Sequence, residues 1–132
     1  MTIQETAETI REENIEIEDM VMGHNVNGGN ALSVLPQWVI NQIQDAAREQ
    51  YGNFIELYHG SDREISEDIE WNENSSFTDE FDIEFAGEDG YIVVAQIPVE
   101  RIRFYLEEEN EFVVSAGELD CEFYTVAEYF GL

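Results

Sequence analysis

Apolar and polar side chains follow a helical period most clearly over residues 33–51. The apolar positions that fall on one helical stripe are Leu35, Trp38, Val39, Ile43, Ala46 and Ala47. Ser33 stands where it can cap the helix, Pro36 suits a first turn, and Gly52 follows the last periodic residue. The pattern therefore predicts a helix between these signals.

Beyond this helix the apolar residues gather into short runs that are typical of strands. Strands are predicted at residues 54–59, 91–99, 111–117 and 121–130, with Pro98 ending the second of these runs. In residues 75–90, Phe77, Phe81 and Phe85 recur every four residues, which indicates a short strand followed by a short helix. Residues 100–108 predict a one- to two-turn helix or a bend. One helix followed by about five strands defines an α+β fold.

The first third of the chain has a weaker pattern. Residues 2–22 predict a short acidic helix that decays into extended chain, and residues 23–30 combine glycine and asparagine as linkers do. We therefore expect an acidic, flexible arm with its linker at 1–32 and a folded domain at 33–132. So short an arm cannot bury a core of its own, and we expect it to be ordered only against the domain or a partner.

The net charge of the chain is the strongest global feature of the sequence. The chain has 31 Asp and Glu against five basic residues, all of them Arg, which gives a formal net charge of −26. Such a surface repels itself in dilute salt and is relieved at molar salt, as expected for a protein of a hypersaline cytoplasm. An alternative is a mimic of nucleic acid that presents carboxylates to a basic partner. Direct binding to nucleic acid or to an anionic membrane is disfavoured, because it needs clustered Lys and Arg.

Other sequence features exclude several classes of protein. The lone Cys121 cannot form an internal disulfide, and with only His24 and His59 beside it no metal site is expected. There is no apolar run near 18 residues and no charged-then-apolar leader at Met1. We therefore expect no membrane span and no export by a signal peptide, and a cytoplasmic or virion-associated location.

Four motifs in order resemble the ADP-ribosyltransferase-like family, including the versions found in phage toxins and fused to viral head-morphogenesis proteins. They are "LYHG" (57–60), "SFTDEFDIEFA" (76–86), "GYIVVAQIPVERI" (90–102) and "ENEFVVSAGEL" (109–119). The resemblance covers about residues 35–127. It implies a split β-sheet domain with a leading helix, and NAD as the substrate.

The resemblance also implies which residues would bind NAD. His59 would hydrogen-bond the ribose on the nicotinamide side, and Gly60 would let the backbone approach the ligand. Ser76 and Thr78, in a Ser-x-Thr motif, would brace the pocket. An Arg would ordinarily meet the pyrophosphate, and only Arg63 lies near the first motif.

The remaining motif, Glu-x-Glu before an apolar strand, implies the catalytic residues. Glu111 would stabilise the positive charge that develops on the ribose as the nicotinamide bond breaks. Glu109 would help to activate the acceptor side chain. Each motif also has a plain structural reading: a hydrogen-bonded His59, Thr78 as a helix N-cap, and a solvated acidic turn at 107–111.

Three functions stay open from the sequence. The first is an ADP-ribosyltransferase-like protein of a halophilic archaeon or its virus that transfers ADP-ribose from NAD to a protein. The second is a catalytically inactive virion or head-assembly protein that docks through its N-terminal arm. The third is the acidic nucleic-acid mimic, which would inhibit a host defence protein. The first two act on or bind a protein partner. The sequence names no target and no oligomeric state.

Overall fold

The computed structural model describes residues 1–27, 29–67, 69–81 and 86–131. The helices are α1 (Ile3–Glu13), α2 (Ile15–Asn27), α3 (Gln37–Tyr51) and α4 (Val126–Phe130), with 3-10 turns η1 (Gly29–Val34), η3 (Val99–Arg101) and η4 (Glu107–Glu109). The strands are β1 (Phe54–Ser61), β2 (Ser75–Phe77), β3 (Tyr91–Pro98), β4 (Ile102–Leu106), β5 (Glu111–Val114) and β6 (Asp120–Thr125). This mixture of helices and sheets is α+β, as predicted.

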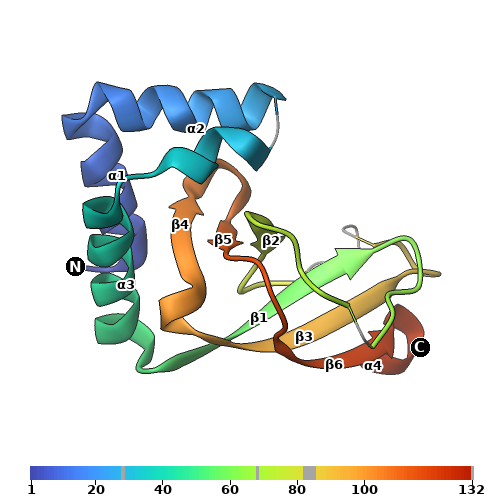
Figure 1. The fold of residues 1–132 in the computed structure, drawn as a ribbon. Coiled ribbons are helices and arrows are strands. Elements are labelled where there is room, and N and C mark those ends of the chain that lie inside the picture. The colour runs from blue at the N-terminus through green and yellow to red at the C-terminus, as the bar shows by residue number, and fades with distance from the viewer. Residues whose placement is uncertain (28, 68, 82–85, 132) are drawn as a thin grey trace.

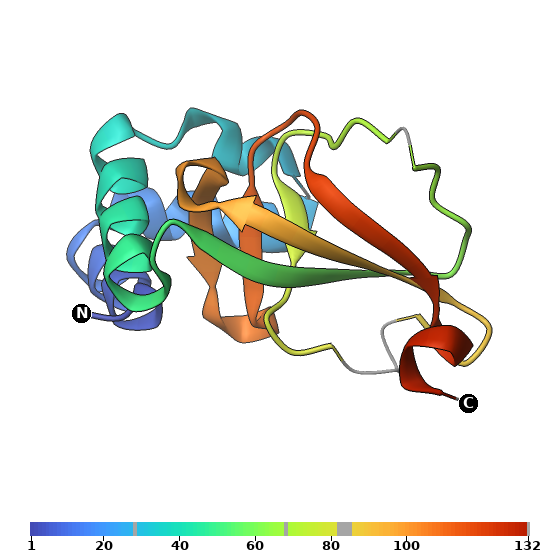
Figure 2. The same ribbon diagram turned by 90° about the horizontal axis from the view of Figure 1, so that it is seen from below.

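The described strands form two small antiparallel sheets, with strand orders β1-β3-β6 and β2-β5-β4 (Figure 1). Seen from below, the long strands of the first sheet run away from α1, α2 and α3 toward α4 at the other end (Figure 2). The two sheets meet where Tyr58 of β1 and Thr78, just after β2, exchange two backbone hydrogen bonds of 2.8 Å. This junction brings the end of β1 beside β2 and β5.

The core is one cluster of buried apolar side chains that joins α1, α2 and α3 to both sheets. The predicted helix is confirmed as α3, which buries Val39, Ile40, Ile43, Ala46 and Ala47. Two details of that prediction are wrong. Trp38 is 43% exposed, because the buried stripe runs through Ile40 instead. Pro36, not Ser33, is the N-cap, since residues 29–34 form the separate turn η1.

The first 27 residues differ most from the sequence-based expectation. Residues 15–27 form α2 rather than extended chain and linker. Ile17 and Val21, one helical turn apart, are both fully buried, whereas Ile15 is 77% exposed, so helical spacing outweighs the alternation of Ile15 and Ile17. α1 adds Ile3, Ala7 and Ile10 to the core. These helices therefore pack on the domain as part of one core.

Two other segments were assigned wrongly from the sequence. Residues 102–106 form β4 instead of a helix or bend: the segment pairs with β5, with a register shift between Ile102 and Phe104, and all of its residues except Arg103 are buried. The last predicted strand ends at Thr125, whose side chain makes a capping box with Glu128 and starts α4. The helix predicted after Thr78, with Phe85, falls largely on residues 82–85, outside the described residues.

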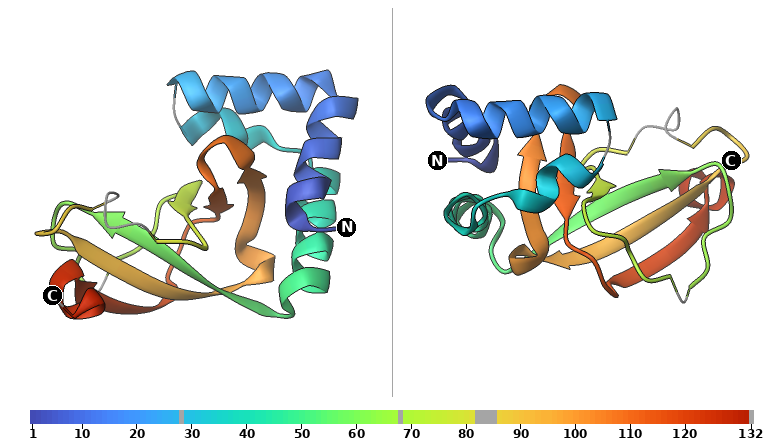
Figure 3. Two further views of the ribbon diagram at one scale, coloured as in Figure 1. Left: turned by 180° about the vertical axis from the view of Figure 1, so that it is seen from behind. Right: turned by 45° about the horizontal axis from the view of Figure 1, so that its top comes forward.

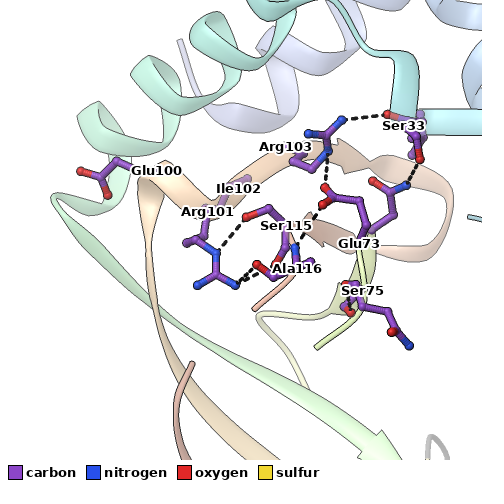
Figure 4. A network of polar contacts seen from close by, with 12 residues as sticks. Ser33, Glu73, Ser75, Glu100, Arg101, Ile102, Arg103, Ser115 and Ala116 are labelled. Carbon is purple, nitrogen blue, oxygen red and sulfur yellow. Dashed lines mark hydrogen bonds and ion pairs between the residues drawn. The ribbon is translucent and has the colours of Figure 1, made fainter. Parts of the chain in front are cut away.

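Arginine side chains fasten the segments around β4 (Figure 4). Arg101 donates to the carbonyl oxygens of Ser115, Ala116 and Glu118, each at 2.8 Å. Arg103 pairs with Glu73 at 3.1 Å and donates to the Leu32 carbonyl at 3.0 Å. Two of the five arginines of the chain thus hold neighbouring segments of the fold together.

The net charge of −26 leads to a prediction about salt. The thermal midpoint should rise between dilute and multimolar potassium chloride, because the screening length falls from about 8 Å at 0.15 M to about 3 Å at 1 M. Circular dichroism at several salt concentrations measures this midpoint. A midpoint that is flat or falls with salt would contradict a halophilic origin of the acidity and favour the nucleic-acid mimic.

Candidate functional site

A cavity of about 400 Å³ opens where the two sheets meet. It lies within the range of roughly 300–1,000 Å³ that is typical of small-molecule sites. Its lining residues are Tyr58, His59, Gly60, Ser76, Phe77, Thr78, Glu109, Asn110 and Glu111, and we call it the Glu111 cavity. All six residues that the motifs singled out, from three separate segments of the chain, therefore line one cavity.

Strand register explains how these side chains meet. In the β2–β5 ladder, Ser76 pairs with Val113, and Glu111 stands two residues from Val113. Side chains two apart on a strand share a face, so Ser76 and Glu111 are diagonal neighbours within reach of each other. β1 brings His59 to the same place through the junction of Tyr58 with Thr78. The location of the cavity thus follows from the sheet topology.

His59 is held against β2 by its ring. Its Nδ1 lies 2.7 Å from the carbonyl oxygen of Ser76. A carbonyl only accepts, so Nδ1 carries the proton and donates, which in the neutral ring leaves Nε2 as an acceptor. The rings of Trp71 and Phe77 pack on the imidazole at centroid distances of 5.1 and 5.5 Å. His59 is therefore oriented both by a hydrogen bond and by aromatic contacts.

Glu111, the first residue of β5, is a buried carboxylate. Only 7% of the residue is exposed, and the Ser76 hydroxyl donates to its Oε1. Burial raises the pKa of the Glu111 carboxyl above its ordinary value, and nearby Glu109 raises it further, while the Ser76 hydroxyl and His24 act in the opposite direction. The carboxyl of Glu111 is therefore shielded from water and held by a hydroxyl.

The turn before Glu111 is fixed by Asn110. Its backbone is left-handed, with φ 50°, a conformation in which Asn is enriched among non-glycine residues. Its side chain accepts from the Tyr105 hydroxyl at 2.6 Å and donates to Asp79 at 2.8 Å. The Thr78 hydroxyl bonds the backbone of Glu80, at 3.2 Å from its nitrogen, and so shapes the loop after β2. Neighbouring Glu109 is exposed at the mouth of the cavity.

Sequence reasoning missed His24, on α2. Figure 3 shows α2 running across the end of the second sheet. The Nε2 of His24 lies 3.8 Å from Glu111 Oε1. Residues 23–30 were interpreted as a linker, so this histidine received no role. The available signal was its spacing from Ile17 and Val21, since i, i+4 and i+7 share one face of a helix.

Arg63 does not line the cavity: it lies exposed in the turn after β1. The described residues contain no group of three or more His, Cys, Asp or Glu placed to hold a metal ion. None of the described helices is long and apolar enough to cross a membrane. The motif side chains that line the cavity are thus a carboxylate pair, one histidine and two hydroxyls.

This set of side chains suits one kind of chemistry. A buried carboxylate stabilises positive charge that develops on a bound ligand, and Ser76 fixes its direction. The oriented imidazole of His59 suits a sugar hydroxyl, and Phe77 and Tyr58 offer apolar surface to a planar ring. Comparison of the chain with protein-family models, curated proteins and solved structures finds no match.

The raised pKa of Glu111 gives a prediction about stability. Because the folded-state pKa lies above the unfolded value, the stabilising effect of the neutral form is complete at low pH and is lost as pH rises through the folded pKa. Glu111→Gln mimics the neutral form. Its thermal midpoint should therefore exceed that of the wild type at pH 7, and the excess should shrink toward pH 4.

Circular dichroism in molar potassium chloride measures this difference. Glu8→Gln, at an exposed position of α1, is the matched control for losing one negative charge from an acidic surface. An equal gain in both variants would show that general repulsion, and not burial, is responsible.

Proposed function

We propose that the chain is an ADP-ribosyltransferase-like protein that binds NAD in the Glu111 cavity and transfers ADP-ribose to a protein. The observation that carries the proposal is the chain of contacts across the cavity: His59 donates to the backbone of Ser76, and the Ser76 side chain donates to buried Glu111. These three residues belong to three of the four motifs that carry the resemblance. The excess of Asp and Glu over basic residues supports a halophilic archaeon, or one of its viruses, as the source.

In the proposed reaction, the bond between the ribose C1′ and the nicotinamide nitrogen breaks, and its electron pair leaves with nicotinamide. Positive charge then develops on the ribose. The ionised Glu111 accepts a hydrogen bond from the 2′-hydroxyl and stabilises that charge. His59 accepts a hydrogen bond from the same sugar through Nε2. A nucleophilic side chain of the acceptor protein forms the new bond to C1′ and loses a proton.

We assign the second role, activation of the acceptor side chain, to Glu109 because of its position. It is exposed, two residues before Glu111, and lines the mouth of the cavity. An acceptor side chain that enters from solvent would meet Glu109 first, where a carboxylate can orient it and receive its proton. This placement supports the division of roles that the Glu-x-Glu motif implies.

Transfer of label tests the proposed function. The full chain, in molar potassium chloride, is incubated with NAD labelled in the adenine-proximal phosphate and with lysate of a halophilic host. Label should become attached to protein, survive denaturation and be competed away by unlabelled NAD. Attachment that also occurs with free labelled ADP-ribose would show non-enzymatic reaction instead of transfer.

A second candidate function is an inactive virion or head-assembly protein that docks through its N-terminal helices. It is favoured by exposed apolar residues on one side of α2, where Ile15, Met22 and Val26 are 77%, 56% and 80% exposed. Large apolar side chains that recur on a solvent-facing helix are typical of binding surfaces. This candidate predicts that the wild-type protein neither binds nor cleaves NAD.

A further inference from the structure

His24 is the strongest feature that the motif resemblance leaves unexplained. Its side chain is 12% exposed, and that of Glu111 is 8% exposed, so two ionisable groups 3.8 Å apart are both shielded from water. At that separation the contact is an electrostatic one, too long for a hydrogen bond. His24 Nδ1 is buried and has no hydrogen-bond partner among the described residues. The ring is therefore oriented by packing, with Nε2 toward the carboxylate.

We infer that His24 is a positioning residue of the Glu111 cavity, which keeps Glu111 ionised and oriented for the sugar hydroxyl. His24 and Ser76 both act on Oε1, from α2 and from β2 respectively. As an account of catalysis, this inference rests on the proposed function.

The electrostatic reason is the surroundings of Glu111. Burial and the nearby Glu109 both favour its neutral form, which could not stabilise charge on a ribose. Across the cavity lie His59, whose Nδ1 is engaged by the Ser76 carbonyl, and Tyr58. Among the described residues that face Glu111, His24 is the side chain in ion-pair range that can carry a positive charge. Its protonated form opposes the effects of burial and of Glu109.

α2 is the element that delivers this charge. Ile17 and Val21 anchor the helix in the core, and His24 follows on the same face, beside Glu111 at the start of β5. Arg11 pairs with both Glu18 of α2 and Glu108 of η4, so the helix is also tied to the turn that carries Glu109. The N-terminal helices therefore contact the turn and the strand that carry Glu109 and Glu111.

Titration of Glu111 by carbon-13 NMR tests the inference without NAD. The full chain is labelled at glutamate side-chain carboxyls in molar potassium chloride, and the Glu111 signal is the one absent from Glu111→Gln. His24→Gln keeps an N–H near the carboxylate but cannot carry a positive charge, so the pKa of Glu111 should rise. His24→Arg keeps a positive charge and should leave the pKa at or below the wild-type value.

Asn25→Gln, at an exposed position of the same helix, is the matched control and should leave the titration unchanged. Circular dichroism checks that each variant is folded. If His24→Gln does not fold, the pKa of Glu111 in His24→Arg is compared with that in the wild type. A raised pKa of Glu111 in the arginine variant would overturn the inference. An unchanged pKa in folded His24→Gln would overturn it as well.

The pH profile of nicotinamide release gives the functional readout. The acid limb should move to higher pH in His24→Gln by the same amount as the titration, and His24→Arg should restore it. A profile that does not move would overturn the role in catalysis. Wild-type protein that does not cleave NAD would overturn the proposed function, while the NMR titration would still decide whether His24 controls Glu111.

Discussion

Glu111→Gln is expected to lower the rate of NAD cleavage by about 10²- to 10³-fold, the scale of losing one preorganised electrostatic partner. Glutamine keeps the size of the side chain and a hydrogen bond, and removes only the negative charge. Because positive charge on the ribose develops mainly in the transition state, the affinity for NAD should change much less than the rate.

Initial rates of nicotinamide release and calorimetric titration with NAD separate these two effects. Glu107→Gln, an exposed residue of η4 close to the cavity in sequence, is the control for removing a carboxylate from this acidic turn. Its rate should stay within about twofold of wild type, the scale expected for a charge outside the site. Equal losses in both variants would contradict a special role for Glu111.

Ile17→Ala is expected to lower the free energy of unfolding by about 2–5 kcal/mol, as for other fully buried aliphatic side chains. Ile17 is fully buried on α2, and truncation would leave a cavity between this helix and the domain. The loss is large compared with a total stability of about 5–15 kcal/mol for a typical domain. Such a loss would establish α2 as part of the core.

Ile15 of the same helix supplies the matched control. It is 77% exposed, so Ile15→Ala should change the free energy of unfolding by no more than about 0.5 kcal/mol. Denaturant titration in molar potassium chloride compares the two variants. Equal, small effects would show that α2 belongs to the flexible arm expected from the sequence and not to the core.

The sequence was most informative where a local pattern of apolar residues fits only one type of secondary structure. The apolar run at residues 91–98 predicted β3, and the stripe through Val39 and Ile43 predicted α3. Short segments were compatible with more than one type of secondary structure. Ile102, Phe104 and Leu106 fit a strand, but in so short a window a helix or bend was equally compatible with the pattern. Their burial against α3, a tertiary effect, decides for the strand.

Some residues of the candidate site could likewise be predicted from the sequence, and others could not. His59, Ser76 and Glu111 were found because each stands in a motif beside an apolar strand, and the sheet topology then brings them to one cavity. Two groups were not found. His24 belongs to a helix that glycine and asparagine disguised as a linker. Asn110 fixes the turn through its left-handed backbone, which its spacing alone does not indicate.

Release of nicotinamide from NAD by the full wild-type chain, in molar potassium chloride, is the most direct test of the Glu111 cavity as a site of NAD cleavage. Chromatography of the reaction over time measures it. The account predicts steady release that depends on protein concentration and is nearly lost in Glu111→Gln. No release and no binding of NAD by folded wild-type protein would contradict the account.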